Sequence, residues 1–310
     1  MMGRTHYALG VLYYLIICMI PTFTIIDFSD NKTMVIGILA AAIGAIFPDA
    51  DSDHSLINNR NPIFKTSNKL INNSKELLKK IFAFTFFSIL AILIIVYMYE
   101  QNSFSKGLII STTLLFILAF NGVKVGKRIY IPVLTDGLRA IDTGAARMKK
   151  IFMTTVYLSI GGVCVYLSGG SIEGIIWGII FMVIALFPHR TFLHSPAGLI
   201  LVTVGVRYLE KRLYLYGISR AFFVGYFSHL YLADIFTNSG VPISTLPLIL
   251  RKIGIHRSLK KYDSYMGLYS ILNRKLSIPL IKTGSRFGGI IEGFYVISLF
   301  SVLVTLLVKG

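Results

Sequence analysis

The sequence has few of the residues that build a disulfide framework or an acidic surface. Of its 310 residues only two are cysteines and one is tryptophan, and 14 acidic residues stand against 31 Lys and Arg. Cys18 and Cys164 both lie inside apolar runs, which is typical of packing residues rather than of a disulfide or a metal site. Ten-residue segments of alternating hydrophobicity, the signature of a transmembrane β-barrel, are also missing.

Apolar residues are abundant instead, and they form long runs. The chain is 55% hydrophobic and its mean hydropathy is +0.71. Because about 20 helical residues cross a bilayer core, we predict an all-α, polytopic membrane protein. It would form one integral membrane domain over 1–310, with about seven to nine spans. The candidate spans are 7–26, 33–47, 81–99, 107–123, 151–168, 172–188, 196–206, 221–236 and 291–308.

Two segments need separate comment. No small-residue cleavage site follows the apolar part of MMGRTHYALGVLYYLIICMI, so we expect an uncleaved first helix rather than a signal peptide. Residues 237–290 form the longest polar stretch, with prolines, basic clusters and tyrosines. Short interfacial helices on the cytoplasmic surface are predicted there.

The net charge of +17 is concentrated in two connecting segments. Residues 60–80 hold six Lys and Arg, and residues 124–150 hold seven. The positive-inside rule therefore places both segments and the N-terminus in the cytoplasm, on the inner membrane. Anionic lipid headgroups are the predicted partners of this charge, and no specific nucleic acid is expected. The basic connection 207–220 conflicts with this topology, unless 196–236 is a re-entrant pair that only dips into the membrane.

Two nine-residue stretches that follow apolar runs both begin Phe-Pro and end His-Ser. They are Phe47–Ser55 (FPDADSDHS) and Phe187–Ser195 (FPHRTFLHS). In the predicted topology both reach the cytoplasmic face, as do His6 before the first span and Asp234 at the end of the eighth. With His229, which precedes Asp234 in the eighth span, five of the six histidines belong to these groups, and only His256 lies elsewhere. The sequence therefore predicts a cluster of imidazoles and carboxylates at one membrane face.

Mixed imidazole and carboxylate ligands suit Zn²⁺, Mn²⁺ or Fe²⁺ better than Ca²⁺ or Mg²⁺. We predict two or three divalent ions, most simply zinc, because the potential ligands are too many for one ion. The predicted metal ligands are His6, Asp49, Asp51, His54, His189, His194, His229 and Asp234.

The spacing within the cluster adds a constraint. His229 and Asp234 are five residues apart, which leaves them about 140° apart on a regular helix. We therefore expect either a π-bulge between them or binding to different ions.

A site of this kind suits hydrolysis of a phosphoester, because metal ions activate water and clamp anionic oxygens. Arg190 would bind the phosphate, and Asp53 would accept a proton. The hydroxyls expected to orient the ligands are those of Ser55, Ser195, Ser228 and Thr237. The position at a membrane face favours a lipid or another membrane-proximal phosphoester as substrate. The oligomeric state stays open.

The same residues carry a resemblance to a known family. The motifs are His6, Pro48-Asp49-x-Asp51-x-x-x-Ser55, His189-Arg190-x-x-x-His194-Ser195 and Gly225-Tyr226-x-x-His229-x-x-x-x-Asp234-x-x-Thr237-x-x-Gly240. Over 1–55 and 185–240 they resemble the YdjM-like family of bacterial inner-membrane proteins. The resemblance implies a membrane-bound, metal-dependent hydrolase. The family is in turn similar to zinc-dependent phospholipase C and P1-type nucleases, which would imply a helical zinc-cluster phosphodiesterase.

The chain departs from the family pattern at a few positions. Thr191 and Leu193 stand where family members often have Gly and Thr. Asp53 and His54 lie outside the matched pattern, so their roles rest on their position alone.

Two other functions use the same cluster. Intramembrane ionisable residues also serve metal-ion or proton transporters, but a transporter would distribute them across the bilayer depth. A non-catalytic scaffold stabilised by metal would keep its ions and turn over no substrate.

Overall fold

The computed structural model describes residues 3–20, 31–52, 55, 58, 61–102, 104–282 and 285–309. This part of the chain contains twelve α-helices and one short pair of strands, which confirms the predicted all-α class. The chain forms two compact units. Unit 1 comprises Met1–Asn61 and Thr154–Gly310, and unit 2 comprises Pro62–Met153. The prediction of one membrane domain over the whole chain stays a prediction.

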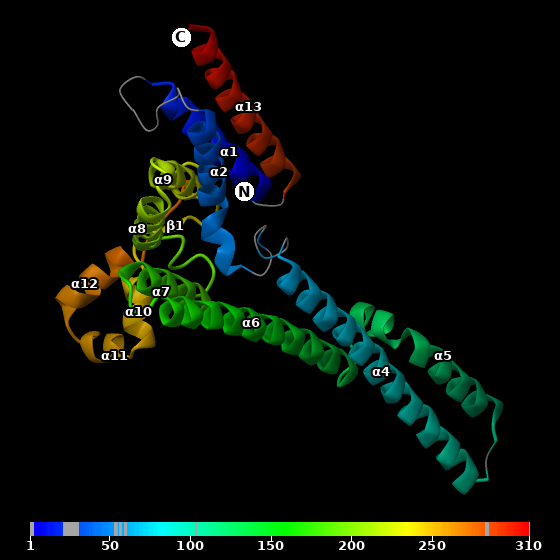
Figure 1. The fold of residues 1–310 in the computed structure, drawn as a ribbon. Coiled ribbons are helices and arrows are strands. Elements are labelled where there is room, and N and C mark those ends of the chain that lie inside the picture. Colours follow the sequence, from blue (N-terminus) through cyan, green and yellow to red (C-terminus); the bar gives the residue numbers. More distant parts are fainter. Residues whose placement is uncertain are drawn as a thin grey trace. The chain divides into compact units, whose positions relative to one another are not determined.

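Unit 1 is built around three helices that lie side by side, α1, α2 and α9 (Figure 1). They span Gly3–Cys18, Asn31–Ile46 and Ile218–Tyr231. A 3₁₀ turn, η1 (Phe47–Asp51), follows α2, and another, η2 (Asp234–Phe236), follows α9. The other long helices of unit 1 are α7 (Ile172–Leu186), α8 (Pro196–Leu213), α13 (Arg286–Lys309) and the end of α6 (Leu134–Leu167).

Glycines let the three central helices touch backbone to backbone. A Cβ on Gly225 of α9 would lie 1.9 Å from the carbonyl oxygen of Ala41 in α2. A Cβ on Gly44 of α2 would lie 2.2 Å from the carbonyl oxygen of Phe222. A Cβ on Gly10 of α1 would lie 2.4 Å from the Cβ of Ala45 and 3.2 Å from the carbonyl oxygen of Ala41, both in α2. Small residues of this kind allow close helix packing in membranes, and here they bring the ends of three helices together.

Unit 2 is an antiparallel hairpin of α4 (Pro62–Glu100) and α5 (Lys106–Arg128), against which the first part of α6 packs. Its core contains Ala83 and Phe87 from α4, and Leu134 and Leu138 from α6. Helix α4 has 39 residues, so it is about 58 Å long, twice the thickness of a hydrocarbon core of about 30 Å. Half of this helix must therefore lie outside the bilayer core.

The basic segments predicted as connections are mostly helical. Residues 62–80 form the first half of α4, while α5 continues to Arg128 and α6 begins at Leu134. Pro62 stands at the first helical position, where its missing N–H costs nothing. Lys, Leu and Glu favour helix, so the basic segments continue the apolar helices next to them without a break. The expectation of loops here was wrong.

Five described helices are long and apolar enough to cross a membrane. They are Lys32–Asp51, Pro62–Glu100, Lys106–Arg128, Leu134–Leu167 and Arg286–Val308. The predicted span at 172–188 is a shorter apolar helix, α7. Helices α8 and α9, over the predicted spans 196–206 and 221–236, are not among the five. Helix α1, over the described part of the predicted span 7–26, is not among them either. The re-entrant pair at 196–236 stays a prediction.

The polar stretch 237–290 contains the short helices predicted for it. They are α10 (Leu246–Lys252), α11 (Ile255–Leu259) and α12 (Asp263–Leu272). Two short strands flank these helices, β1 (Val241–Pro242) before them and β2 (Lys275–Leu276) after them. The strands pair antiparallel, so the segment leaves and rejoins the rest of unit 1 at neighbouring positions.

Candidate metal centre

Side chains from five segments of unit 1 meet at one place. The segments are α1, η1, the turn between α7 and α8, α9 and η2. Two of the three central helices, α1 and α9, supply a ligand near one of their ends, and η1 supplies Asp49 directly after α2. In α1, His6 precedes Gly10 by four residues, and in α9, His229 follows Gly225 by four residues. Residues four apart share a helix face, so the faces that pack closely are also the faces that carry the histidines.

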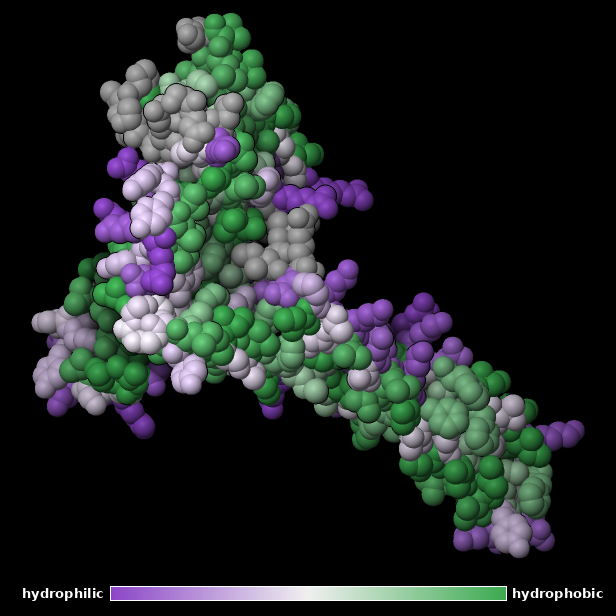
Figure 2. Space-filling view, viewed as in Figure 1, coloured by the Kyte–Doolittle hydropathy of each residue, from purple (hydrophilic) through white to green (hydrophobic). Residues whose placement is uncertain are grey.

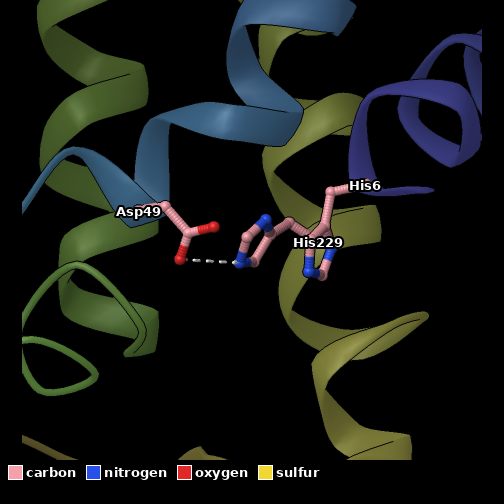
Figure 3. A group of neighbouring side chains, drawn as sticks. All are labelled: His6, Asp49 and His229. Atoms are coloured by element: carbon pink, nitrogen blue, oxygen red, sulfur yellow. Dashed lines mark ion pairs between the residues drawn. The ribbon is translucent and has the colours of Figure 1, made fainter. Parts of the chain in front are cut away.

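Asp49, His229 and His6 lie in a row, with the His229 ring in the middle (Figure 3). The rings of His6 and His229 stack with centroids 3.8 Å apart and planes 19° apart. Nε2 of His229 lies 3.9 Å from Oδ1 of Asp49. Its other nitrogen, Nδ1, lies 2.6 Å from the carbonyl oxygen of Ala45. A carbonyl can only accept, so Nδ1 carries the proton and Nε2 offers a lone pair to the cluster.

Asp234 forms the second half of the cluster with His194. Both side chains are fully buried, and Nε2 of His194 lies 3.4 Å from Oδ2 of Asp234 and 3.5 Å from Oδ1 of Asp49. Asp234 Oδ2 is 3.6 Å from Nε2 of His229, and Oδ1 is 3.6 Å from Nε2 of His6. These separations are too long for good hydrogen bonds, yet short enough for several groups to share one cation.

His189 lies on the open side of the cluster, with 36% of its side chain exposed. Its Nδ1 is 2.6 Å from Oδ1 of Asp51, while Nε2 faces Oδ1 of Asp49 at 3.9 Å. Donation from Nδ1 to a buried carboxylate orients an imidazole and raises its basicity, as is common around metal sites. The contact of Asp51 is therefore with the outer nitrogen of a candidate ligand.

The structure resolves the spacing problem at His229 and Asp234 in a way that the sequence did not predict. Helix α9 ends at Tyr231, and Asp234 begins η2. The chain bends between them, so the two side chains face one another and belong to the same candidate group. The expected π-bulge is therefore not formed between them, and their binding to different ions stays a prediction.

Three overlapping groups of ligand atoms could hold a metal ion, each with its atoms within 4.8 Å of one another. They are His6–Asp49–His229, Asp49–His189–His194 and His194–His229–Asp234. Asp49, His194 and His229 each belong to two groups, so neighbouring ions could share them. Asp51 lies outside all three groups.

Unpaired buried atoms support a cation at this place. In the described part of the chain, ten buried side-chain N and O atoms lack a hydrogen-bond partner, and seven belong to His6, Asp51, His194, His229 and Asp234. Each such atom costs about 1–3 kcal/mol, and more when charged. A bound divalent ion would satisfy most of them at once, so these residues fit a metal.

Two charged groups of the cluster hold each other ionised. Burial lowers the pKa of His194, but the carboxylates of Asp234 and Asp49 act in the opposite direction and together raise it to about 9. Burial raises the pKa of Asp234, but His194 and His229 outweigh it and hold the pKa well below the ordinary value. Without metal, a proton on His194 thus partly takes the place of a cation.

Arg190 reaches the same carboxylate from the turn before α8. Its backbone is left-handed, with φ of 62°, which is uncommon for a residue other than glycine. Its Nη2 lies 3.6 Å from Oδ1 of Asp234, and its Nη1 lies 3.5 Å from the hydroxyl of Thr237. The Thr237 hydroxyl also donates to the backbone oxygen of Asp234 at 2.8 Å, so Thr237 supports both residues.

The other predicted orienting hydroxyls bond to backbone groups instead of ligand side chains. Ser195 caps α8, where its Oγ accepts from the Gly198 N–H. The hydroxyl of Ser228 donates to the Gly225 oxygen, and Ser55 accepts from the Asn58 N–H. Asp53 and His54, predicted as proton acceptor and ligand, lie outside the described residues.

Residues without a predicted role hold the turn that carries Asp49 and Asp51. The amide of the buried Asn58 donates to the oxygens of Ala50 and Ser52 at 3.0 and 2.6 Å. The hydroxyl of Tyr157 in α6 donates to Asn58 Oδ1 at 2.8 Å and lies 3.2 Å from the Ala50 oxygen. Nothing in the local sequence marks these long-range contacts.

Two further residues fix neighbouring elements. Tyr226, fully buried in α9, donates to the Leu193 oxygen at 2.7 Å and so anchors the turn with His189 and His194. Glu292, buried in α13, accepts from Thr5 at 2.7 Å, next to His6. An acidic residue inside an apolar helix is itself a signal of a specific partner, and Glu292 could have been found in that way.

One family matches almost the whole chain. It is described as YdjM inner membrane protein, and the match covers residues 1–309. No curated protein and no solved structure matches the chain. The expected likeness to zinc-dependent phospholipase C and P1-type nucleases therefore stays a prediction.

Proposed function

Because the chain belongs to the YdjM family of inner membrane proteins, we propose that its buried His/Asp centre makes it a membrane-bound, metal-dependent hydrolase. The observation that carries the proposal is the set of three overlapping ligand groups, with an arginine 3.6 Å from the buried Asp234. A site that only stabilised the fold would be complete with a single closed set of ligands. Shared ligands and an adjacent guanidinium suit binding of an anion instead.

Two or three divalent ions, most simply zinc, would occupy the centre. His6, Asp49, His189, His194, His229 and Asp234 would hold them, and Mn²⁺ or Fe²⁺ would suit the same donors. When bound, such ions lower the pKa of water and withdraw charge from a phosphoryl oxygen. We assign Asp51 to orienting His189 rather than to direct coordination, because its oxygen lies at Nδ1.

The side chains around the centre divide the remaining tasks. Arg190 would bind a phosphate oxygen and stabilise the charge that develops as the water oxygen bonds to phosphorus. The bond between phosphorus and the ester oxygen breaks, and that oxygen takes up the proton that the attacking water gives up. Among the described ligands, Asp49 and His189 are the more exposed, with 23% and 36% of their side chains accessible. Substrate would therefore approach from their side.

A membrane lipid phosphoester is the substrate class that we propose. Asp49 lies near the end of Lys32–Asp51, one of the segments long and apolar enough to cross a membrane, so the centre would lie near a membrane face. The ligands gather at this one depth instead of following a path through the bilayer, which favours a hydrolase over a transporter.

The test combines metal analysis with turnover. Full-length protein purified in mild detergent should contain at least two transition-metal ions per chain, by our assignment of shared ligands. It should hydrolyse a phospholipid or a model phosphodiester, and a chelator should abolish that activity. Arg190→Gln should keep its metal but lose about 100-fold or more in kcat/KM, while the exposed Arg207→Gln should match wild type.

Other outcomes would change the assignment. Protein that retains metal but turns over no phosphoester would be a metal-stabilised scaffold. Metal flux into proteoliposomes would make it a transporter. Protein that binds no metal at all would remove the basis of the proposal.

A further inference from the structure

A second candidate site lies in unit 2, in a groove between α4 and α5. The groove has a volume of about 540 Å³, and none of its lining residues is a candidate ligand of the metal centre. Its wall is basic at one end, with Lys80, Lys124 and Lys127, and also Glu76. The remaining lining includes Ile81, Phe84 and Phe120.

The order of these residues is the same on both helices. In α4, Phe84 follows Lys80 by four residues, and in the antiparallel α5, Phe120 precedes Lys124 by four. Residues four apart share a helix face. Each wall of the groove therefore changes from cation to aromatic ring in the same direction. On the α4–α5 hairpin in Figure 2, a hydrophilic patch is followed by a hydrophobic surface.

The carboxylates near these three lysines are Glu76, which lines the same groove, and Asp142, which attracts Lys127 without forming an ion pair with it. One turn away, Lys79 is buried and its Nζ lies 2.5 Å from Asp142, which also lies 3.7 Å from Lys75. No carboxylate of the described residues lies within ion-pair distance of Lys80, Lys124 or Lys127. The protein thus neutralises the inner lysines and leaves three exposed cations at the head of an apolar groove.

The change from lysine to phenylalanine along the groove lies where α4 changes from polar to apolar, as expected at the boundary of a membrane. The first half of α4 is polar, whereas its second half is among the most apolar windows of the chain, with mean hydropathy 2.7. A bound molecule that follows the groove needs an anionic group at the boundary and an apolar chain below it. We propose that this groove binds an anionic glycerophospholipid, with its phosphate on Lys80, Lys124 and Lys127 and an acyl chain against Phe84 and Phe120.

The proposal is independent of hydrolysis and is tested by lipid binding. Native mass spectrometry of the full-length protein in neutral detergent would compare added phosphatidylglycerol with phosphatidylcholine. Wild type should prefer phosphatidylglycerol. Each lysine near a membrane surface contributes about fivefold to binding of anionic lipid, so K80Q/K124Q/K127Q should lose about 100-fold in affinity. The matched control R147Q/K149Q/K150Q removes the same charge from α6 and should lose less than about twofold.

Further variants and ligands separate binding in the groove from an effect of net charge. K80R/K124R/K127R should retain the preference, and Phe84→Ala should weaken binding of long-chain but not dihexanoyl phosphatidylglycerol. If the triple glutamine variant does not fold, Lys124→Gln alone should lose about fivefold. Equal losses in the variant and its control would overturn the site, because the effect would then be one of net charge. Inorganic phosphate that competes as well as the lipid would also overturn it, since the groove would then select only the anion.

Discussion

The two units treat charged side chains among apolar helices differently. In unit 2, Lys79 is 4% exposed and its ammonium group lies 2.5 Å from the half-exposed Asp142. That contact is complete, because the opposite charge is supplied by the chain. In unit 1, Asp234 and His194 are fully buried with separations of 3.4 Å or more, and their polar atoms lack hydrogen-bond partners.

The difference shows how a binding site can be told from a structural ion pair. In a pair that closes at hydrogen-bond distance, the attraction between the two charges offsets at least part of the cost of removing them from water. In a cluster whose ligands lie near one another but form no hydrogen bonds, the desolvation cost of the buried polar atoms remains. A bound cation would offset that cost. By this criterion the centre of unit 1 is incomplete without a cation, whereas the Lys79–Asp142 pair needs nothing.

The largest effect should come from Asp49→Asn. The carboxylate is shared by two of the three ligand groups, so its loss should release metal and reduce hydrolysis by about 1000-fold or more. Metal content and turnover would be measured on the same preparation. The preference of unit 2 for phosphatidylglycerol should not change. A variant with full metal content would show that Asp49 is no ligand, and a lost lipid preference would show that the two sites are coupled.

The second largest effect should come from Gly225→Ala. Its Cβ would meet the Ala41 backbone at 1.9 Å, and backbone cannot move aside. We expect a loss of at least about 3 kcal/mol in stability and a loss of metal, because α2 and α9 carry ligands. In unit 2, Gly122→Ala would meet the Ala83 and Phe87 side chains at 2.8 and 3.0 Å and should cost less.

Thermal unfolding in detergent would compare these variants with Gly293→Ala, where no atom lies within 4 Å. That control should be neutral or slightly stabilising. If Gly225→Ala unfolds like wild type, close packing of α2 on α9 does not hold the centre together.

The convergence of the ligands could be predicted from the sequence, whereas their exact partners could not. Placing His6, Asp49, His194 and Asp234 at one face needs only the alternation of apolar spans and the positions at which each span stops. The close contacts of α1, α2 and α9 depend on which helices become neighbours. A glycine in the sequence does not indicate which helix packs against it.

Two local features of the centre, the end of α9 and the different environments of Asp49 and Asp51, had no clear signal in the sequence. Helix α9 ends at Tyr231 before Leu232 and Ala233, without the Gly or Pro that usually marks a helix end, so the meeting of His229 with Asp234 could not be derived. The separate environments of Asp49 and Asp51 arise because η1 turns their side chains to different neighbours. The helical form of the basic segments was within reach, since Lys, Leu and Glu favour helix.

A smaller effect concerns pH and acts only on unit 1. Burial lowers the pKa of His194, but Asp234 and Asp49 outweigh it and raise the pKa to about 9. The protonated ring therefore stabilises the metal-free fold below about pH 6.5, and this contribution is lost as pH rises to 9. Metal needs the neutral ring, so metal affinity should rise by up to about tenfold per pH unit over the same window.

Unfolding midpoints of chelator-treated and metal-loaded protein would test this. The metal-free midpoint should fall between pH 6.5 and 9, and the difference between the two forms should widen. Two curves that stay parallel would mean that His194 does not exchange a proton for metal.

The smallest effect should come from Tyr157→Phe. Its hydroxyl bonds to Asn58 and to the Ala50 oxygen, and so it holds the turn with Asp49 and Asp51. Removing such an outer contact weakens metal binding by about tenfold, and the fold should be retained because the ring still packs. The matched variant in unit 2 is Tyr130→Phe, whose hydroxyl bonds to the exposed Asp136. Competition with a chelator of known affinity would measure both. If Tyr157→Phe binds metal as tightly as Tyr130→Phe, the turn is rigid without its clamp, and the positions of Asp49 and Asp51 are set by α2 alone.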